Sequence, residues 1–306
     1  MSDTPLPVSV EVPASSANLG PGFDALAAAL DVTLTVTAVP RHAQRVVAHG
    51  NGAEELPGDD SNLIWRGVLA YCEHFGPEVP DITLHSDNDI PLERGMGSSA
   101  AAAVAGVTLG REVLQAGGTD ADLVSLAAQL EGHPDNAAAA MLGGLVVCAD
   151  GFARRLEPAT YLRPVVCIPT ARQSTSAARG VLPETVTLAA AAGNGGRVAM
   201  VLAGLAGHIA WEPAVMHDVL HEPPRFRVMT ESGALVARLR EQGIGACLSG
   251  AGPTVLAIVP IDDAGAVERV TGAVSDGWEV RAIDWHRRGA SRVNTSDRSR
   301  AEERQW

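Results

Sequence analysis

A glycine- and serine-rich segment that runs directly into alanines is the feature that most constrains how this chain folds. It reads PLERGMGSSAAAA from Pro91 to Ala103. Glycines let backbone N–H groups approach an anion, serines can cap a following helix, and small alanines permit tight packing behind the loop. The free N–H groups and the positive dipole end of such a helix suit a triphosphate. Taken alone, the segment fits an ordinary capped, alanine-rich helix slightly better.

Two more glycine-containing segments lie on either side of it in the sequence. The first reads PASSANLGPGFD from Pro13 to Asp24, where glycines and a proline end a strand and polar side chains remain at the turn. Turn chemistry alone explains that composition. The second reads SGAGPT from Ser249 to Thr254, between two predicted strands. It fits either a hairpin connection or the mouth of a nucleotide cleft.

Apolar periodicity predicts alternating strands and helices in the first half of the chain. We expect strands at 8–12, 30–36, 82–85 and 144–149, and helices at 62–74, 98–115 and 120–130. Ser61 is the expected cap of the first of these helices. No internal repeat is present.

The second half gives a clearer order of elements. We expect a strand at 165–168, a helix within 188–208, a helix at 233–242, strands at 246–248 and 254–259, a helix at 264–274 and a strand at 278–283. This order approximates a split β-α-β-β-α-β sandwich. The length favours two domains, which we expect at 1–158 and 159–286. The polar tail at 287–306 is expected to be disordered.

Composition excludes several functions. The formal charge of −13 argues against nucleic-acid binding. The sequence contains no lysine, which rules out a Walker-type phosphate loop and a Schiff-base lysine. The four cysteines form no metal-type cluster. We see no signal peptide and no apolar run of membrane-spanning length, and therefore expect a cytoplasmic protein that does not bind a membrane.

Together, the three glycine-containing segments resemble the three motifs of the GHMP kinase superfamily in order and approximate spacing. The middle one is similar to the phosphate loop Pro-x-x-x-Gly-Leu-Gly-Ser-Ser-Ala, with Met96 in place of leucine. The run ANLGPGFD resembles the homoserine kinase branch, whereas galactokinases carry a different segment and mevalonate kinases a catalytic lysine. The resemblance extends from about Val8 to Trp285. It implies an α+β fold with a ribosomal-protein-S5-like N-terminal domain and a ferredoxin-like C-terminal sandwich.

The resemblance also implies ATP- and Mg²⁺-dependent phosphorylation of the L-homoserine hydroxyl, a step of threonine biosynthesis. The loop amides and one magnesium ion are expected to stabilise the charge on the transferred phosphoryl group. Ser99 and Glu131 are the expected metal ligands, and Ser98 is nearly as good a candidate as Ser99. The expected nucleotide-binding residues are Pro91, Arg94, Gly95, Met96, Gly97, Ser98, Ser99, Ala100 and Ala101.

Three further runs resemble the homoserine site of this family: EGHPDNA from Glu131, QSTSAAR from Gln173 and HEPPR from His221. The resemblance implies that two arginines bind the α-carboxylate, that Asn18 and Asp24 face the α-amino group, and that Asn136 orients the attacking hydroxyl. Asp24 is the alternative catalytic base. The expected substrate-binding residues are Asn18, Asp24, His133, Asn136, Thr175, Arg179 and Arg225.

Two other interpretations stay open at this point. The chain could be another GHMP small-molecule kinase, or a catalytically silent GHMP-fold binding protein. The silent protein predicts a damaged phosphate loop or the loss of Glu131, and neither is seen. A dinucleotide-binding dehydrogenase is excluded because its G-x-G-x-x-G fingerprint needs a third glycine, which is missing after Gly97. The expected partners are ATP and homoserine alone, with a homodimer implied by the resemblance.

Overall fold

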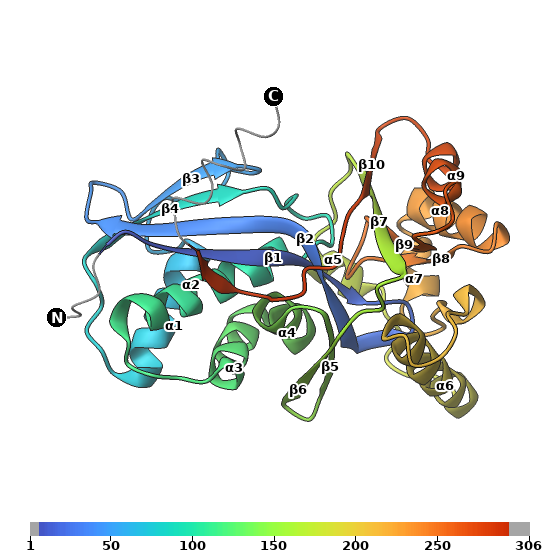
Figure 1. Ribbon diagram of the computed structural model, residues 1–306, viewed down its shortest axis with the longest axis horizontal. Coiled ribbons are helices and arrows are strands. Elements are labelled where there is room, and N and C mark those ends of the chain that lie inside the picture. Colours follow the sequence, from blue (N-terminus) through green and yellow to red (C-terminus); the bar gives the residue numbers. More distant parts are fainter. Residues whose placement is uncertain (1–5, 294–306) are drawn as a thin grey trace.

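The computed structural model describes residues 6–293 and contains two β-sheets with helices packed against them (Figure 1). The larger sheet has the order β11-β1-β2-β4-β3, and β5 pairs with both β2 and β6. Its pairs are antiparallel except for the parallel pair of β3 and β4. Its strands are β1 (Val8–Asn18), β2 (Gly22–Pro40), β3 (Val46–Gly50), β4 (Ile82–Asn88), β5 (Leu145–Ala149), β6 (Phe152–Leu156) and β11 (Ser291–Val293).

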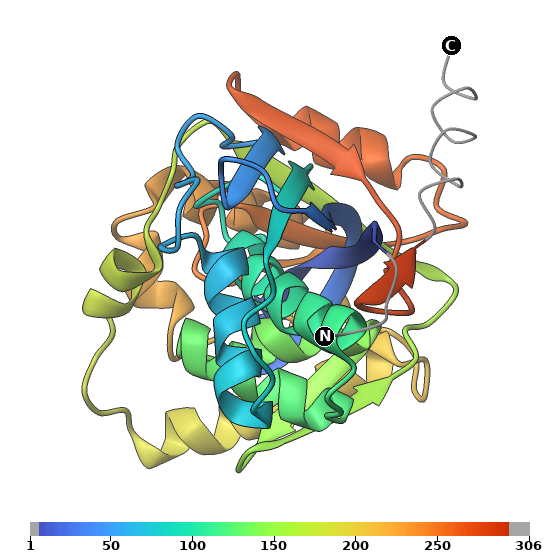
Figure 2. The same cartoon turned by 90° about the vertical axis from the view of Figure 1, so that its left-hand side faces the viewer.

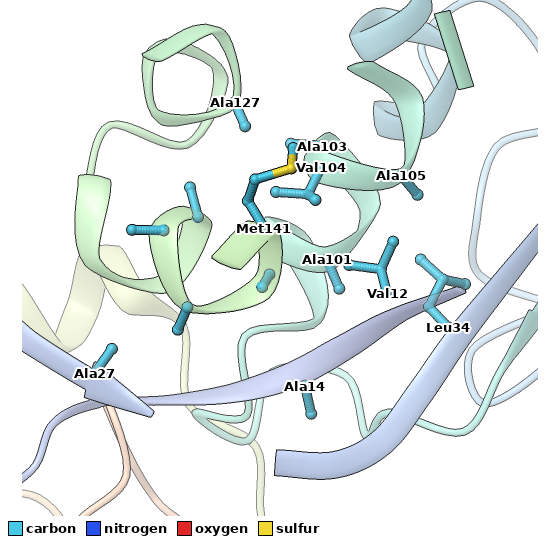
Figure 3. Close-up of a cluster of buried hydrophobic side chains, with 14 of the residues drawn as sticks. Val12, Ala14, Ala27, Leu34, Ala101, Ala103, Val104, Ala105, Ala127 and Met141 are labelled. Carbon is cyan, nitrogen blue, oxygen red and sulfur yellow. The ribbon is translucent and has the colours of Figure 1, made fainter. Parts of the chain in front are cut away.

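Four helices lie on one side of this sheet, where two of them contact the strands and the other two pack against these helices (Figure 1). They are α1 (Leu63–Phe75), α2 (Ser98–Leu114), α3 (Asp120–Glu131) and α4 (Pro134–Leu142). Small residues bring them close together: a Cβ atom on Gly106 of α2 would lie only 2.0 Å from the Ile64 carbonyl oxygen of α1. In Figure 3, Ala101 and Val104 of α2 point towards Val12 of β1 and Met141 of α4. The alanine-rich helix after the glycine loop is therefore a core helix.

The smaller sheet has the order β10-β7-β9-β8 and is antiparallel throughout. Numbered along the chain, that order is 4-1-3-2, which confirms the expected split β-α-β-β-α-β sandwich. Its strands are β7 (Leu162–Pro169), β8 (Gly245–Leu248), β9 (Val255–Pro260) and β10 (Trp278–Ala282), and its main helices are α8 (Thr230–Glu241) and α9 (Ala266–Ala273). Between β7 and α8 lie α5 (Thr175–Gly180), α6 (Leu188–Leu205) and α7 (Glu222–Phe226).

The expected elements are present, with three local differences. Strand β2 begins at Gly22, because β1 and β2 form one long hairpin whose turn is the first glycine-containing segment. The short strands β3 and β6 and the helices α4, α5 and α7 were not predicted. Asn62, not Ser61, caps α1: its side chain accepts the Ile64 N–H at 2.9 Å, while the Ser61 hydroxyl donates to Asp59 at 2.6 Å.

The expectation of a disordered tail from residue 287 is wrong for residues 287–293. Strand β11 pairs antiparallel with β1, opposite Ser9 to Glu11, because β1 would otherwise leave one row of backbone groups unpaired at the sheet edge. Figure 2 shows this red strand beside the dark blue β1. The rest of the predicted tail lies outside the described residues. The chain changes sheets between β6 and β7, and the domain boundary at residue 158 stays a prediction.

Helix α6 corrects the expectation that no apolar run reaches membrane-spanning length. Its 18 residues have a mean hydropathy of 1.3, enough to cross a bilayer by length and composition. Much of that hydropathy comes from alanines and from valine and leucine side chains, of which Val201 and Leu205 are buried. The Asn194 side chain anchors the helix by donating to the Pro21 carbonyl at 2.7 Å.

Candidate active site

The three glycine-containing segments meet at one place in the structure. The Ser15 N–H donates to the Met96 carbonyl at 3.1 Å, which joins β1 to the middle segment. The Ser249 hydroxyl donates to the Gly95 carbonyl at 2.7 Å, and the Gly250 N–H donates to the Ala17 carbonyl at 3.1 Å. Segments separated by more than 230 residues in the sequence therefore form one hydrogen-bonded unit.

Two glycines of the middle segment are required by their surroundings. Gly95 and Gly97 have φ angles of 75° and 68°, a region that side-chain-bearing residues rarely adopt. A Cβ atom on Gly95 would lie 2.2 Å from the Ser249 carbonyl oxygen, and one on Gly97 would lie 2.0 Å from the Ser15 hydroxyl. The loop is thus closely packed against the other two segments.

The start of α2 differs from the expected serine cap. Gly97 is the N-cap residue, and Ser98 and Ser99 are already the first two helical residues. Gly97 has no side chain, so within residues 6–293 the cap makes no side-chain hydrogen bond to the first-turn amides. The N–H groups at the start of α2 therefore remain able to bind an anion, and the helix dipole adds to that attraction.

A hydroxyl and a carboxylate lie together beside this helix start. The Ser99 hydroxyl donates to the Glu131 carboxylate, which comes from the end of α3. Burial raises the pKa of Glu131, and the hydrogen bond from Ser99 opposes that rise. Two oxygen donors suit Mg²⁺, which usually binds one or two carboxylates together with substrate phosphates. Residues 6–293 contain no cluster of three acidic, histidine or cysteine side chains that could hold a metal by themselves.

A cleft of about 440 Å³ extends from the helix start to a second group of charged side chains, which includes Asp24, Arg179 and Arg225. All the predicted site residues line it except Ala100 and Ala101, which are buried behind the loop. Arg94 lines the cleft, but its guanidinium group donates to the carbonyls of Leu92, Pro169 and Thr170 and so braces the loop. The predicted residues in the lining are Asn18, Asp24, Pro91, Arg94, Gly95, Met96, Gly97, Ser98, Ser99, Glu131, His133, Asn136, Thr175, Arg179 and Arg225.

Opposite charges face one another at the far end of the cleft. Arg179 of α5 forms an ion pair with Asp24 at 2.6 Å. The Arg225 side chain of α7 is 2% exposed, and its guanidinium lies 5.4 Å from the ring centre of Phe23. Burial lowers the pKa of Arg225 and the charge of Arg179 adds to the effect, but the value of about 10 keeps the group charged at neutral pH. These groups match a ligand that carries both charges.

The Asn18 side chain connects two backbone segments at this end of the site. Its amide nitrogen donates to the Gly250 carbonyl at 2.8 Å, and its amide oxygen accepts the Asp24 N–H at 3.2 Å. Asn18 and Asp24 both have positive φ angles, of 70° and 53°. The side chain of Asn18 therefore holds the turn that carries Asp24 in an uncommon backbone conformation.

Asn136 and Asp135 lie at the start of α4 and line the cleft. A Cβ atom on Gly97 would lie 3.2 Å from the Asn136 amide oxygen, and Asp135 lies near the charges of Asp24 and Arg179. The Asn136 amide oxygen accepts a hydrogen bond from the Ser15 hydroxyl at 2.8 Å, which orients the amide. Asp135 is 2% exposed and lines the cleft, and its carboxylate accepts the Asn136 N–H at 2.8 Å. Burial raises the pKa of Asp135, and the nearby charge of Asp24 raises it further. The sequence analysis overlooked Asp135, although it stands beside the residue that was selected.

The chain matches two family models. Residues 62–144 match the model for the GHMP kinases N terminal domain, and residues 205–280 match the model for the GHMP kinases C terminal region. The first match contains the glycine loop, Glu131 and Asn136. The second contains Arg225 and the segment from Ser249 to Thr254.

Curated proteins and solved structures agree with these matches. A homoserine kinase of Streptomyces avermitilis is 41% identical over 295 residues, 93% of this chain and 95% of that protein. One from Corynebacterium glutamicum (strain R) is 41% identical over 84% of this chain and 87% of its own length. The crystal structure of homoserine kinase from Cytophaga hutchinsonii superposes with a TM-score of 0.83 at 25% identity, over 96% of this chain and 99% of that one.

The same fold extends to more distant proteins. Mevalonate kinase from Methanococcus jannaschii has a TM-score of 0.67 at only 12% identity, over 90% of this chain and 98% of its own, so that likeness concerns the fold alone. The curated relatives, by contrast, match almost the whole sequence at 40% identity or above. The chain belongs to the homoserine kinase family of the GHMP kinases.

Proposed function

We propose that this protein transfers the γ-phosphoryl group of ATP to the side-chain hydroxyl of L-homoserine. The observation that supports this most is the layout of the cleft. An uncapped helix start, suited to phosphates, lies at one end, and paired carboxylate and guanidinium groups, suited to an amino acid, lie at the other. Asn136 stands between them. A hydroxyl bound beside Asn136 would therefore face the phosphoryl group.

The amino-acid end is arranged for a zwitterion. Asp24 and Arg179 neutralise one another at 2.6 Å. An α-amino acid can replace that pair, since its ammonium group can bind Asp24 and its carboxylate can bind Arg179 and Arg225. Asp135 supplies a second carboxylate, which is buried and lies near Asp24. A ligand with only one of the two charges would leave an unpaired charge in the cleft, which is unfavourable.

The nucleotide end binds through the backbone. The amides from Gly95 to Ser99 would bind the phosphates, with Ser99 and Glu131 holding a magnesium ion. That ion, when bound, neutralises charge on the phosphates. Arg94 holds the loop from behind, through the carbonyls of the strand end at Pro169 and Thr170. The chain contains no lysine, so the positive charge of the helix start must come from backbone dipoles and arginines.

Asn136 is the residue that orients the acceptor hydroxyl. Its amide oxygen is engaged by Ser15, so its amide nitrogen is the atom that can contact the substrate. Phosphoryl transfer through a loose transition state needs little help from a base, and the hydroxyl proton can pass to the transferred phosphate. Asp24, the alternative base, is paired with Arg179 and serves better as the partner of the ammonium group.

A coupled assay of ADP release tests the proposal. We expect ADP to form only when ATP, Mg²⁺ and L-homoserine are all present. Mevalonate and galactose separate the related GHMP activities, and 4-hydroxybutyrate, which lacks the amino group, tests the zwitterion argument. We expect its kcat/KM to be at least 100-fold below that of homoserine, on the scale of two lost charge-assisted hydrogen bonds. Equal turnover of mevalonate or galactose, or no turnover at all, would contradict the proposed function.

Magnesium use, a cytoplasmic location and a homodimer belong to the same proposal. Ser99 and Glu131 support the first, and the net charge of −13 supports the absence of nucleic-acid partners. Exposed apolar side chains near and on α6, among them Leu188, Met200 and Ile209, offer a surface for self-association. Sedimentation velocity of the wild type tests the dimer, and a Leu188→Asp variant tests whether this surface is used.

A further inference from the structure

A buried histidine lies directly behind the arginine end of the cleft. His221 is 0% exposed, and its ring stacks on Phe23 with 5.1 Å between ring centres. Its Nε2 atom lies 2.9 Å from the Gly20 carbonyl oxygen, and its Nδ1 atom lies 2.9 Å from Nη1 of Arg225. A carbonyl only accepts and a guanidinium only donates, so the proton must be on Nε2 and the lone pair on Nδ1. The ring is therefore held as one neutral tautomer.

The two bonds of His221 reach the two sides of the amino-acid pocket. Gly20 belongs to the turn between β1 and β2 that leads to Asp24, the residue expected to face the ammonium group. Arg225 faces the carboxylate side, and its remaining bonds go to the carbonyls of Ala178 at 3.3 Å and Gly250 at 3.2 Å. The His221 side chain therefore connects the turn before Asp24 to the Arg225 guanidinium.

We propose that His221 is a positioning residue that fixes the spacing between Arg225 and the turn carrying Asp24, acting as a neutral imidazole with its proton on Nε2. The proposal rests on the proposed function, because it assigns these two groups to one α-amino acid. The ammonium and carboxylate groups of such a substrate are attached to the same carbon atom. A pocket that selects them must therefore keep its own charges at a fixed separation.

The charges around the ring are consistent with a neutral histidine. The charged groups that act on it are Asp218, Glu222 and Arg225. Arg240 pairs with Glu222, and Arg179 pairs with Asp24. Burial lowers the pKa of His221, the charge of Arg225 adds to this, and Asp218 and Glu222 oppose it. Glu222 is engaged by Arg240 at 2.7 Å and by the Leu248 N–H at 3.1 Å. A second ring proton would also remove the acceptor that Arg225 uses.

Two isosteric variants separate positioning from packing. In His221→Asn the amide oxygen can take the place of Nδ1 and accept from Arg225, whereas in His221→Gln the amide nitrogen can take the place of Nε2 and donate to Gly20. Each variant keeps only one of the two bonds that span the pocket, so we expect both to raise the KM for homoserine at least tenfold. The KM for ATP should change less than twofold in both. A KM for homoserine within threefold of the wild type in either variant, or a raised KM for ATP, would overturn the proposal.

A spectroscopic measurement tests the tautomer without any substrate. Long-range ¹H–¹⁵N spectra of the wild type and of His221→Gln identify the His221 signals by their loss in the variant. We expect the pattern of a neutral ring protonated at Nε2, unchanged from pH 8 to about pH 5.5. A charged ring or an Nδ1-protonated ring in this range contradicts the inference. Absence of homoserine turnover in the wild type would instead refute the proposed function, so the two failures can be told apart.

Discussion

The two ends of the cleft are built in different ways. The nucleotide end is made of backbone: Gly95 and Gly97 have no room for a side chain, and the amides at the start of α2 are the proposed binding groups. The amino-acid end is made of side chains, and buried partners such as His221 hold them from behind. A backbone site depends on a few residues within one short segment. A side-chain site depends on contacts between segments that are far apart in the sequence.

The difference predicts how each end responds to substitution. A residue that intrudes on the backbone loop changes the path of the chain, so its effect should be large and should fall on ATP. A residue removed from the amino-acid end leaves the chain path intact, so its effect should fall on homoserine. The variants below test this division, beginning with the largest expected effect.

Gly95→Ala should lower kcat/KM for ATP at least 100-fold. The added Cβ atom would lie 2.2 Å from the backbone oxygen of Ser249, and a φ of 75° is unfavourable for alanine. Gly97→Ala should be less severe, because its main clash is with the rotatable hydroxyl of Ser15. Steady-state kinetics with varied ATP measure both.

Gly117→Ala is the matched control for the glycine variants. Gly117 also has a positive φ, of 100°, but no atom lies within 4 Å of its hypothetical Cβ. We expect kinetics within twofold of the wild type, with only the stability change of a strained alanine. If Gly117→Ala lowers kcat/KM as much as Gly95→Ala, backbone strain and not crowding at the phosphate loop explains the loss.

Arg225→Ala should raise the KM for homoserine by about 30- to 100-fold, which is the range expected for a lost charge-assisted contact. The KM for ATP should stay nearly unchanged, because the guanidinium lies at the amino-acid end. Arg269→Ala, which breaks the exposed ion pair between Arg269 of α9 and Asp263, is the control and should change neither KM. A loss of ATP affinity in Arg225→Ala would place that arginine on the nucleotide.

Asn136→Ala should lower kcat more than tenfold while thermal unfolding stays close to that of the wild type. The side chain lies where the two ends meet, so its loss should impair the reaction more than the binding of either substrate. Single-turnover measurements at saturating ATP and homoserine report the chemical step directly. A turnover equal to that of the wild type would remove Asn136 from the mechanism.

The smallest expected effect concerns Glu131 and is a change with pH in the Mg²⁺ concentration that gives half-maximal activity. Burial raises the pKa of this carboxylate, so protons compete with a bound cation at a higher pH than for an exposed glutamate. The Mg²⁺ concentration for half-maximal activity should therefore rise several-fold as the pH falls from 7.5 to 5.5. In Glu131→Gln it should be higher at every pH and nearly independent of pH. Parallel pH profiles for both proteins would contradict this role.

The same division explains which features could be predicted from the sequence. The helix from Ser98 was predicted to within one residue, because glycines, serines and alanines each limit the local backbone. The order of the smaller sheet followed from its alternating elements. Strand β11 was missed because its pairing depends on the free edge of β1, about 280 residues earlier, and not on its own composition.

The amino-acid end was only partly predictable. Arg179 and Arg225 were found through a resemblance, since an arginine in an isolated motif looks like a surface residue. His221 stands in the same HEPPR run as Arg225, and Asp135 stands beside Asn136, yet nothing in the local sequence shows that these two side chains are buried against the site. Their importance comes from partners such as Gly20 and Asp24, which only the folded chain brings near.

The most direct test of the central claim is the chemical identity of the phosphorylated product. A ³¹P NMR spectrum of a completed reaction with ATP, Mg²⁺ and L-homoserine would show where the γ-phosphoryl group has gone. We expect a phosphomonoester signal coupled to the side-chain methylene protons, in an amount equal to the ADP formed. Inorganic phosphate in its place, or ATP left intact, would show that the two ends of the cleft do not act on one pair of substrates.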